Sequence, residues 1–238
     1  MGMTTKKEID LTKELARRLQ KKFPSFKIFA NKCPSRGKRI KERWMKIFHE
    51  TCPPLQPEID LVFLEPQSNG RPIIRAFEIK YFEKKGSVSQ SFYKGIEQAL
   101  ALLQWGFDNV GLWQIFDESI PERDVRDYGC RTWRYLHGML NLPIEYTPIH
   151  LVSRTYNMGF QVVQADWANN LYPIPLRDID DPLFRFNYSQ PNPFSTRELR
   201  ERKYGDIIEA PNIQRILREV DTLREFLLEW LPEQKNGF

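Results

Sequence analysis

The chain has 238 residues, of which 41% are hydrophobic and 28% are charged, and this composition suits one well-sized domain with additions. No apolar run approaches the roughly 18 residues that a membrane-spanning helix needs, so we expect no membrane partner. Three cysteines are a sparse and odd set that argues against a disulfide framework, and we therefore expect a cytoplasmic, intracellular protein.

Residues 9–23 have the pattern of an amphipathic helix. Leu11, Leu15, Leu19 and Phe23 recur at every fourth position, and basic residues occupy other positions around the helix. Glu14 lies beside this stripe rather than opposite it. We therefore expect a helix that packs its stripe against a core, with Glu14 at the border of that contact.

A basic segment follows the first helix. It contains a single acidic residue, Glu42, and one interleaved aromatic residue, Trp44. Its basic side chains are Lys32, Arg36, Lys38, Arg39, Lys41, Arg43 and Lys46. Such a cluster is typical of contacts with nucleic-acid phosphates, and Trp44 adds weak support for stacking on a base. A solvated basic loop has the same composition, so both interpretations remain open.

Two runs, residues 58–65 and 73–82, predict the strands of a β-hairpin. Both are rich in β-branched and aromatic residues, and segment 67–72 between them has the composition of a turn. Side chains alternate between the faces of a strand, so Glu78 and Lys80 share one face of the second strand. Burying a carboxylate and a lysine there costs free energy, and a function would explain that cost.

A divalent-metal site is the functional interpretation of this hairpin. Asp60 and Glu78 would supply the carboxylate oxygens that Mg²⁺ or Mn²⁺ prefers, with the Ile79 carbonyl as a third ligand. Lys80 would hold the attacking water or neutralise the charge that develops during phosphodiester hydrolysis. The competing interpretation is an ordinary Glu–Lys pair on a half-exposed strand.

The middle of the chain predicts alternating helices and strands. We expect an apolar, buried helix within residues 88–105, a strand at 109–116, a helix at 121–141 that begins with Pro121, and strands at 148–153 and 160–165. This alternation implies a mixed α/β sheet.

Residues 166–238 differ in composition and sequence pattern from the predicted core, residues 1–165. Segment 171–194 is rich in proline and predicts a connector without regular elements. An apolar stripe from Ile213 to Trp230 predicts a long amphipathic helix. This helix either packs on the core or forms the interface of a homodimer.

The hairpin motif resembles that of the PD-(D/E)XK nuclease superfamily. Asp60, Glu78 and Lys80 match the D…(E)xK core of the family, although Pro57 precedes Asp60 by three positions where the family often has proline directly before the aspartate. The resemblance covers residues 8–165. It implies a restriction-endonuclease-like α-β-β-β-α-β core with a mixed central sheet, here with a C-terminal helical extension, and a metal site at the fork of that sheet.

The resemblance also implies supporting residues. Members of the family often carry a glutamate on the first helix that reaches the metal, and Glu14 is the candidate here. Similar nucleases place a Gln or Lys near the scissile phosphate from the helix after the hairpin, which points to Gln98 and Lys94. Leu102 stands where the family usually has tyrosine. Ordinary surface roles for Glu14, Gln98 and Lys94 are the alternatives.

The sequence therefore predicts a deoxyribonuclease that depends on Mg²⁺ or Mn²⁺ and acts on DNA. Its catalytic residues would be Asp60, Glu78, Lys80 and Gln98. One alternative is the same fold as a catalytically unused subunit that binds nucleic acid or an assembly partner. Another is a different α/β enzyme in which Glu78 and Lys80 form only a structural ion pair.

Overall fold

The computed structural model describes residues 3–32, 42, 58–83, 93–103, 105–153, 158–163, 177–182, 184 and 224–232. Its elements follow in the order α1 (Met3–Lys22), β1 (Lys27–Lys32), β2 (Ile59–Glu65), β3 (Ile73–Phe82), α3 (Ile96–Leu103), β4 (Asn109–Phe116), α4 (Glu122–Trp133), the π-helical turn η2 (Arg134–Met139), β5 (Ile144–Ser153), β6 (Met158–Val162) and β7 (Arg177–Asp178). A further helix covers residues 224–232. No helix within these ranges is both long and apolar enough to cross a membrane.

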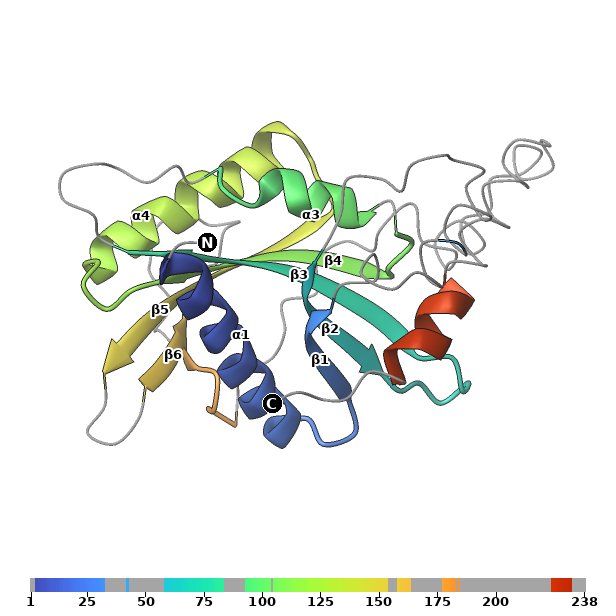
Figure 1. The fold of residues 1–238 in the computed structure, drawn as a ribbon. Helices are drawn as coiled ribbons and strands as arrows, with labels where there is room; N and C mark the ends of the chain where they lie inside the picture. The colour runs from blue at the N-terminus through green and yellow to red at the C-terminus, as the bar shows by residue number, and fades with distance from the viewer. Residues whose placement is uncertain are drawn as a thin grey trace.

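The seven strands form one mixed sheet in which each strand lies beside its neighbours in the sequence, from β1 to β7 (Figure 1). β1, β2 and β3 are antiparallel neighbours, β3, β4 and β5 run parallel, and β6 and β7 return antiparallel. Parallel neighbours need a crossover, and α3 and α4 supply the two that are required. The protein is therefore an α/β protein with a mixed sheet, as the sequence predicts.

Helices cover both faces of this sheet (Figure 1). α1 buries its leucine stripe against one face, in a cluster that includes Phe77 of β3 and Trp113 of β4. α3 and η2 cover the opposite face, where Leu102 and Leu136 pack in a second cluster with Leu112 of β4. The sheet thus lies between two apolar layers, and a charged side chain on either face of its centre is buried.

Strands β3 and β4 begin and end where the sequence predicts. Every residue of β4 is buried, which explains why its sequence is a nearly continuous apolar run rather than an alternating one. α1 is confirmed as an amphipathic helix, but it begins at Met3 rather than at Ile9. This earlier start brings an additional turn, with Glu8, into the helix.

Other boundaries differ from the prediction. β1 was not predicted, because its sequence KIFANK has only a short apolar centre; its Ile28 and Phe29 are nevertheless buried. β5 begins at Ile144 instead of Pro148, so proline lies inside the strand rather than at its start. α3 covers only Ile96–Leu103 of the predicted range, and residues 88–92 lie outside the described part of the chain.

The described parts of residues 166–238 pack on the core. The helix at 224–232 buries Phe226 and Trp230 in the cluster with α3, and Arg224 Nη1 lies 2.6 Å from Asp108 Oδ2. Ile179 and Phe184 join the cluster beneath α1. The two-residue strand β7 lies in a segment predicted to lack regular elements, so that prediction was wrong there. The alternative of a homodimer interface stays a prediction.

Candidate functional site

The site lies where β2 separates from β3. The register pairs Leu61 with Phe77, and the next antiparallel position sets Asp60 opposite Glu78. β2 begins at Ile59, whereas β3 continues to Phe82. The last residues of β3 therefore extend beyond their β2 partner, and this fork in the sheet leaves backbone groups that side chains can satisfy.

Two carboxylates take the place of strand partners at this fork. The backbone N–H of Ile79 donates to Asp60 Oδ2 at 2.7 Å, and the N–H of Tyr81 donates to Glu8 Oε2 at 2.9 Å. The two donors are two residues apart on one strand edge, so they hold the two acids next to each other. In an extended strand the C=O of Ile79 points to the same side as its N–H, toward this fork.

Asp60 and Glu78 lie on the same face of the sheet. Strand alternation puts Asp60 with Val62 and Glu78 with Ala76, and both of these apolar residues pack in the cluster with α3. Lys80 follows Glu78 on that face. The carboxylates of Asp60 and Glu78 therefore lie on one face, at opposite positions of the two strands.

Lys80 connects the acidic side chains. Its ammonium forms an ion pair with Glu78 Oε1, and it lies 3.7 Å from Glu8 Oε1. The side chain of Glu78 is only 1% exposed and that of Lys80 only 9%. One ammonium thus faces several acids inside a nearly closed site.

Burial and the neighbouring charges shift the pKa values of Asp60, Glu78 and Lys80. Burial raises the pKa of Asp60 to about 7, although the Lys80 charge and the Ile79 N–H oppose the shift. Burial and the neighbouring Asp60 raise the pKa of Glu78 to about 8. Burial alone would lower the pKa of Lys80, but Glu78, Asp60 and Glu8 outweigh it and raise that pKa. Lys80 is therefore a cation near neutral pH, and the buried Glu78 and the partly buried Asp60 ionise close to that pH.

The turn before α3 packs directly against Lys80. A Cβ placed on Gly95 would lie 2.7 Å from Lys80 Cγ and 2.9 Å from Leu112 Cδ1, so glycine is needed for this close approach. Lys94 is exposed, with its Nζ 5.7 Å from the ring centroid of Phe82. Lys94 lies in the turn before α3 rather than on the helix, and its contact with nucleic acid stays a prediction.

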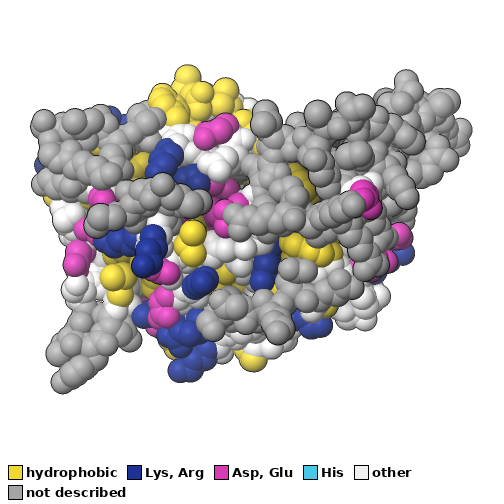
Figure 2. All heavy atoms as spheres, in the orientation of Figure 1, with side chains coloured by type: hydrophobic (Ala, Val, Ile, Leu, Met, Phe, Trp, Pro, Cys, Tyr) yellow, Lys and Arg dark blue, Asp and Glu magenta, His cyan; other side chains and the backbone are white. Residues whose placement is uncertain are grey.

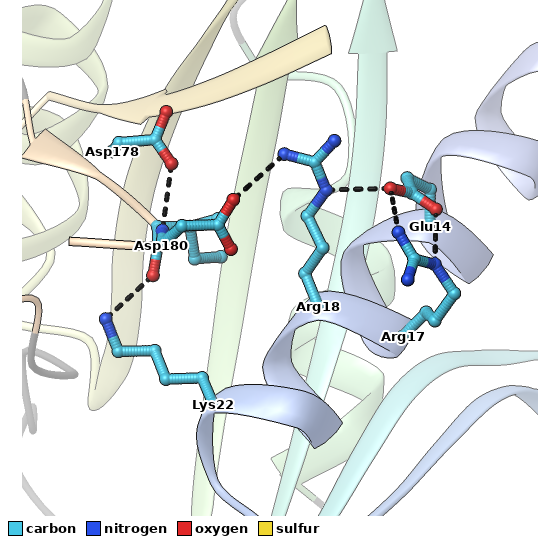
Figure 3. Close-up of polar contacts among 7 residues, drawn as sticks. Glu14, Arg17, Arg18, Lys22, Asp178 and Asp180 are labelled. Carbon is cyan, nitrogen blue, oxygen red and sulfur yellow. Dashed lines mark hydrogen bonds and ion pairs between the residues drawn. The ribbon is translucent and has the colours of Figure 1, made fainter. Parts of the chain in front are cut away.

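The position of Glu14 corrects the prediction for the first helix. Glu14 Oε1 lies 2.7 Å from both Arg17 and Arg18, and Arg18 also reaches Asp180 beyond β7 (Figure 3). These guanidinium groups, Arg17 foremost, lower the pKa of Glu14 to about 2. The helical carboxylate at the cluster is Glu8 instead, because α1 begins earlier than predicted.

The remaining predicted residues are Gln98 and those of the basic segment. Gln98 lies on α3 and is partly buried, and its catalytic role stays a prediction. The basic residues Arg36, Lys38, Arg39, Lys41 and Arg43, together with Trp44, lie outside the described residues. On the described surface over α1, Lys and Arg side chains are interspersed with Asp and Glu (Figure 2).

Sequence reasoning missed three residues at the site. Glu8 fell just before the predicted start of the helix. Gly95 carried no signal beyond being a glycine next to a helix. Gln114 did carry one, since it is a polar residue inside the apolar run NVGLWQIF.

The donor chemistry of the cluster suits a hard divalent cation, since Asp60, Glu78 and Glu8 all offer carboxylate oxygens. Across the described part of the chain, however, no three His, Cys, Asp or Glu side chains stand as a ready-formed metal site. The acids are instead arranged around Lys80. A cation that bound here would compete with the ammonium for the Glu78 oxygens.

No protein-family model, no curated protein and no solved structure matches this chain.

Proposed function

We propose that the protein is a metal-dependent nuclease that hydrolyses phosphodiester bonds in DNA, built on a restriction-endonuclease-like fold. The observation that carries the proposal is the convergence of Asp60, Glu78 and Lys80 at the fork between β2 and β3, joined by Glu8. These residue types at a fork in a mixed sheet are what the PD-(D/E)XK resemblance implies.

The order of elements supports the assignment of fold. From α1 to β4 the described elements follow as α-β-β-β-α-β, the order that the resemblance implies. The fork lies between the second and third of these strands, which are also the second and third strands of the seven-stranded sheet.

The charge balance supports a cation as cofactor. Glu8, Asp60 and Glu78, when ionised, carry three negative charges against the one positive charge of Lys80. Burial opposes this excess, which is why the pKa values of Asp60 and Glu78 are raised. Mg²⁺ or Mn²⁺ would offset it, with Asp60 and Glu78 as ligands and Glu8 and the Ile79 carbonyl beside them. Such an ion activates water for attack and polarises the phosphate when it is bound.

Lys80 acts in this proposal as a cation. Its raised pKa keeps it protonated, so it cannot accept a proton from water at neutral pH. It can donate hydrogen bonds to the nucleophile or to a phosphate oxygen, and it can stabilise the negative charge that develops in the transition state. Lys94, exposed next to this position, supplies a second positive charge for the DNA backbone.

One observation favours a second function. Lys80 and Glu78 form a direct ion pair, and such a pair also fits a purely structural role in a subunit that binds nucleic acid or another partner without cleaving it. The two functions differ in their response to metal. Mg²⁺ or Mn²⁺ should raise the melting temperature of the nuclease, because its native state binds the ion, but not that of the non-catalytic subunit.

The test uses labelled linear, circular and branched DNA with Mg²⁺, Mn²⁺ or EDTA. The nuclease proposal predicts metal-dependent cleavage that Lys80→Met lowers by about 100-fold or more, while Glu14→Gln, on the far part of α1, leaves the rate unchanged. Binding of DNA without cleavage, and without any metal-induced rise in melting temperature, would favour the non-catalytic subunit.

A further inference from the structure

Gln114 is a fully buried amide in the middle of the central strand. It is 0% exposed, it lies in β4 among apolar residues, and the register places it beside Lys80 of β3. A buried amide without hydrogen bonds destabilises a protein substantially. The hydrogen-bond partners of the Gln114 amide are therefore important for the structure around it.

The amide connects β5 to the turn that precedes α3. Gln114 Nε2 donates to the backbone carbonyl of Lys94 at 3.3 Å, and the hydroxyl of Tyr146 donates to Gln114 Oε1 at 2.8 Å. The carbonyl can only accept, so it fixes the nitrogen end of the amide toward Lys94. Tyr146 is itself buried, in the cluster that packs under α3. A chain of hydrogen bonds thus runs from the core to the turn.

The turn held in this way is tightly fitted. Gly95 has φ of +94° and approaches the Lys80 side chain so closely that a Cβ would meet Lys80 Cγ at 2.7 Å. The backbone N–H of Ile96 donates to the Tyr93 carbonyl at 3.1 Å and closes the turn. A displacement of the Lys94 carbonyl would therefore move both the Lys94 side chain and the methylene groups of Lys80.

From these contacts we infer that Gln114 is a positioning residue, which fixes the turn Tyr93–Gly95 so that Lys94 stands beside Lys80 at the carboxylate cluster. Gln114 itself need not touch the substrate. The catalytic consequence of this inference rests on the proposed nuclease function, whereas the mechanical link between Gln114 and the turn does not.

The mechanical link is tested by hydrogen exchange. Gln114→Met has a similar volume and removes the hydrogen bonds to the Lys94 carbonyl and to Tyr146, so exchange in residues 93–98 should accelerate about tenfold relative to the wild type. Exchange in α4, residues 122–130, serves as the internal control and should change much less. Tyr146→Phe keeps the Gln114–Lys94 bond and should have an intermediate effect, which provides a second variant if Gln114→Met folds poorly. Equal acceleration in both regions would overturn the inference, because it would indicate general destabilisation, and so would unchanged exchange in residues 93–98.

The catalytic consequence is tested by a double-mutant cycle on the rate of DNA cleavage at saturating substrate. Gln114→Met and Lys94→Ala should each lower this rate by about tenfold or more, since small misplacements of a positioned group have effects of this size. Added to Lys94→Ala, Gln114→Met should cost less than about threefold, because both changes remove the same contribution. Losses that multiply fully would show that Gln114 does not act through Lys94. If the wild-type protein cleaves no DNA, the proposed function fails, and the exchange measurement still decides the mechanical link.

Discussion

The backbone N–H of Ile79 and the carboxylate of Asp60 are joined by a hydrogen bond of 2.7 Å between β3 and β2. The backbone of one strand therefore orients the acid of its neighbour, and the side chain of Ile79 is left for the apolar core beneath α1. Tyr81 holds Glu8 in the same way, two residues further along β3. A rigid strand edge thus arranges two carboxylates next to a third, Glu78, without relying on the less stable geometry of a loop.

Glu8→Gln and Glu14→Gln form a matched pair on the same helix. A glutamine at position 8 can still accept from the Tyr81 N–H but removes a negative charge from the cluster. We expect Glu8→Gln to lower the cleavage rate and to raise the Mn²⁺ concentration needed for half-maximal rate, each by about tenfold. Glu14→Gln should change neither, and equal effects of the two substitutions would place Glu8 outside the site.

Glu78→Gln should flatten the dependence of stability on pH. The pKa of Glu78 is raised from 4.5 to about 8. Below about pH 4 this shift does not lower the free energy of unfolding, because Glu78 is protonated in both the folded and the unfolded state. Stability then falls as pH rises toward 8, because the unfolded state releases its proton first. Urea unfolding without metal, at intervals from pH 5 to 8.5, measures this loss.

When the same pH series is measured with Mg²⁺ or Mn²⁺, we expect the stabilisation by the metal to increase with pH. A divalent cation favours the ionised acids, so the stabilisation it gives to the wild type should grow between about pH 6 and 8. A metal effect that is independent of pH would indicate binding elsewhere on the protein.

Gly95→Ala and Gly70→Ala separate backbone strain from contact with Lys80. Both glycines have positive φ, +94° and +77°, so alanine at either position should cost about 1 kcal/mol in the free energy of unfolding. Of these two glycines, only Gly95 would bring the new Cβ against neighbours, which are the methylene groups of Lys80 and the side chain of Leu112. We expect Gly95→Ala to cost additional stability and to lower cleavage, whereas Gly70→Ala should leave cleavage unchanged. A normal rate in Gly95→Ala would contradict the close packing of the turn on Lys80.

Arg18→Met and Arg17→Met test how the segment around β7 is held on α1. Both arginines pair with Glu14, but only Arg18 is buried, and of the two it alone forms an ion pair with Asp180 (Figure 3). The guanidinium of Arg18 also lies 5.1 Å from the ring centroid of Phe160. Arg18→Met should lower the free energy of unfolding by about 2 kcal/mol. Arg17→Met should change the melting temperature little. Equal changes would show that the contact with Asp180 contributes nothing.

The strand part of the site could be predicted from sequence because its information is local. Alternation along β3 places Glu78 and Lys80 on one face, and the short turn between the strands brings Asp60 opposite them. These rules need no knowledge of the rest of the fold.

The helical part could not be predicted in this way. Which turn of α1 meets the end of β3 depends on where the helix begins and on how it crosses the sheet, and neither is encoded near Glu8 or Glu14. Arg17 and Arg18 already argued against Glu14 as a metal ligand, because an acidic residue three or four positions from an arginine on a helix pairs with it. Gln114 was missed although it is a polar residue within an apolar strand, and its partners, the Lys94 carbonyl and Tyr146, come from distant positions in the sequence.

Calorimetric titration of Mn²⁺ into the wild type and Asp60→Asn, at pH 7.5 without DNA, tests whether the carboxylates at the fork bind a metal ion. Asparagine can still accept from the Ile79 N–H, so the strand fork should persist while one charged ligand is lost. We expect saturable binding to the wild type and an affinity lowered by about tenfold or more in Asp60→Asn. Absence of binding to the wild type, or equal affinity in both proteins, would contradict it.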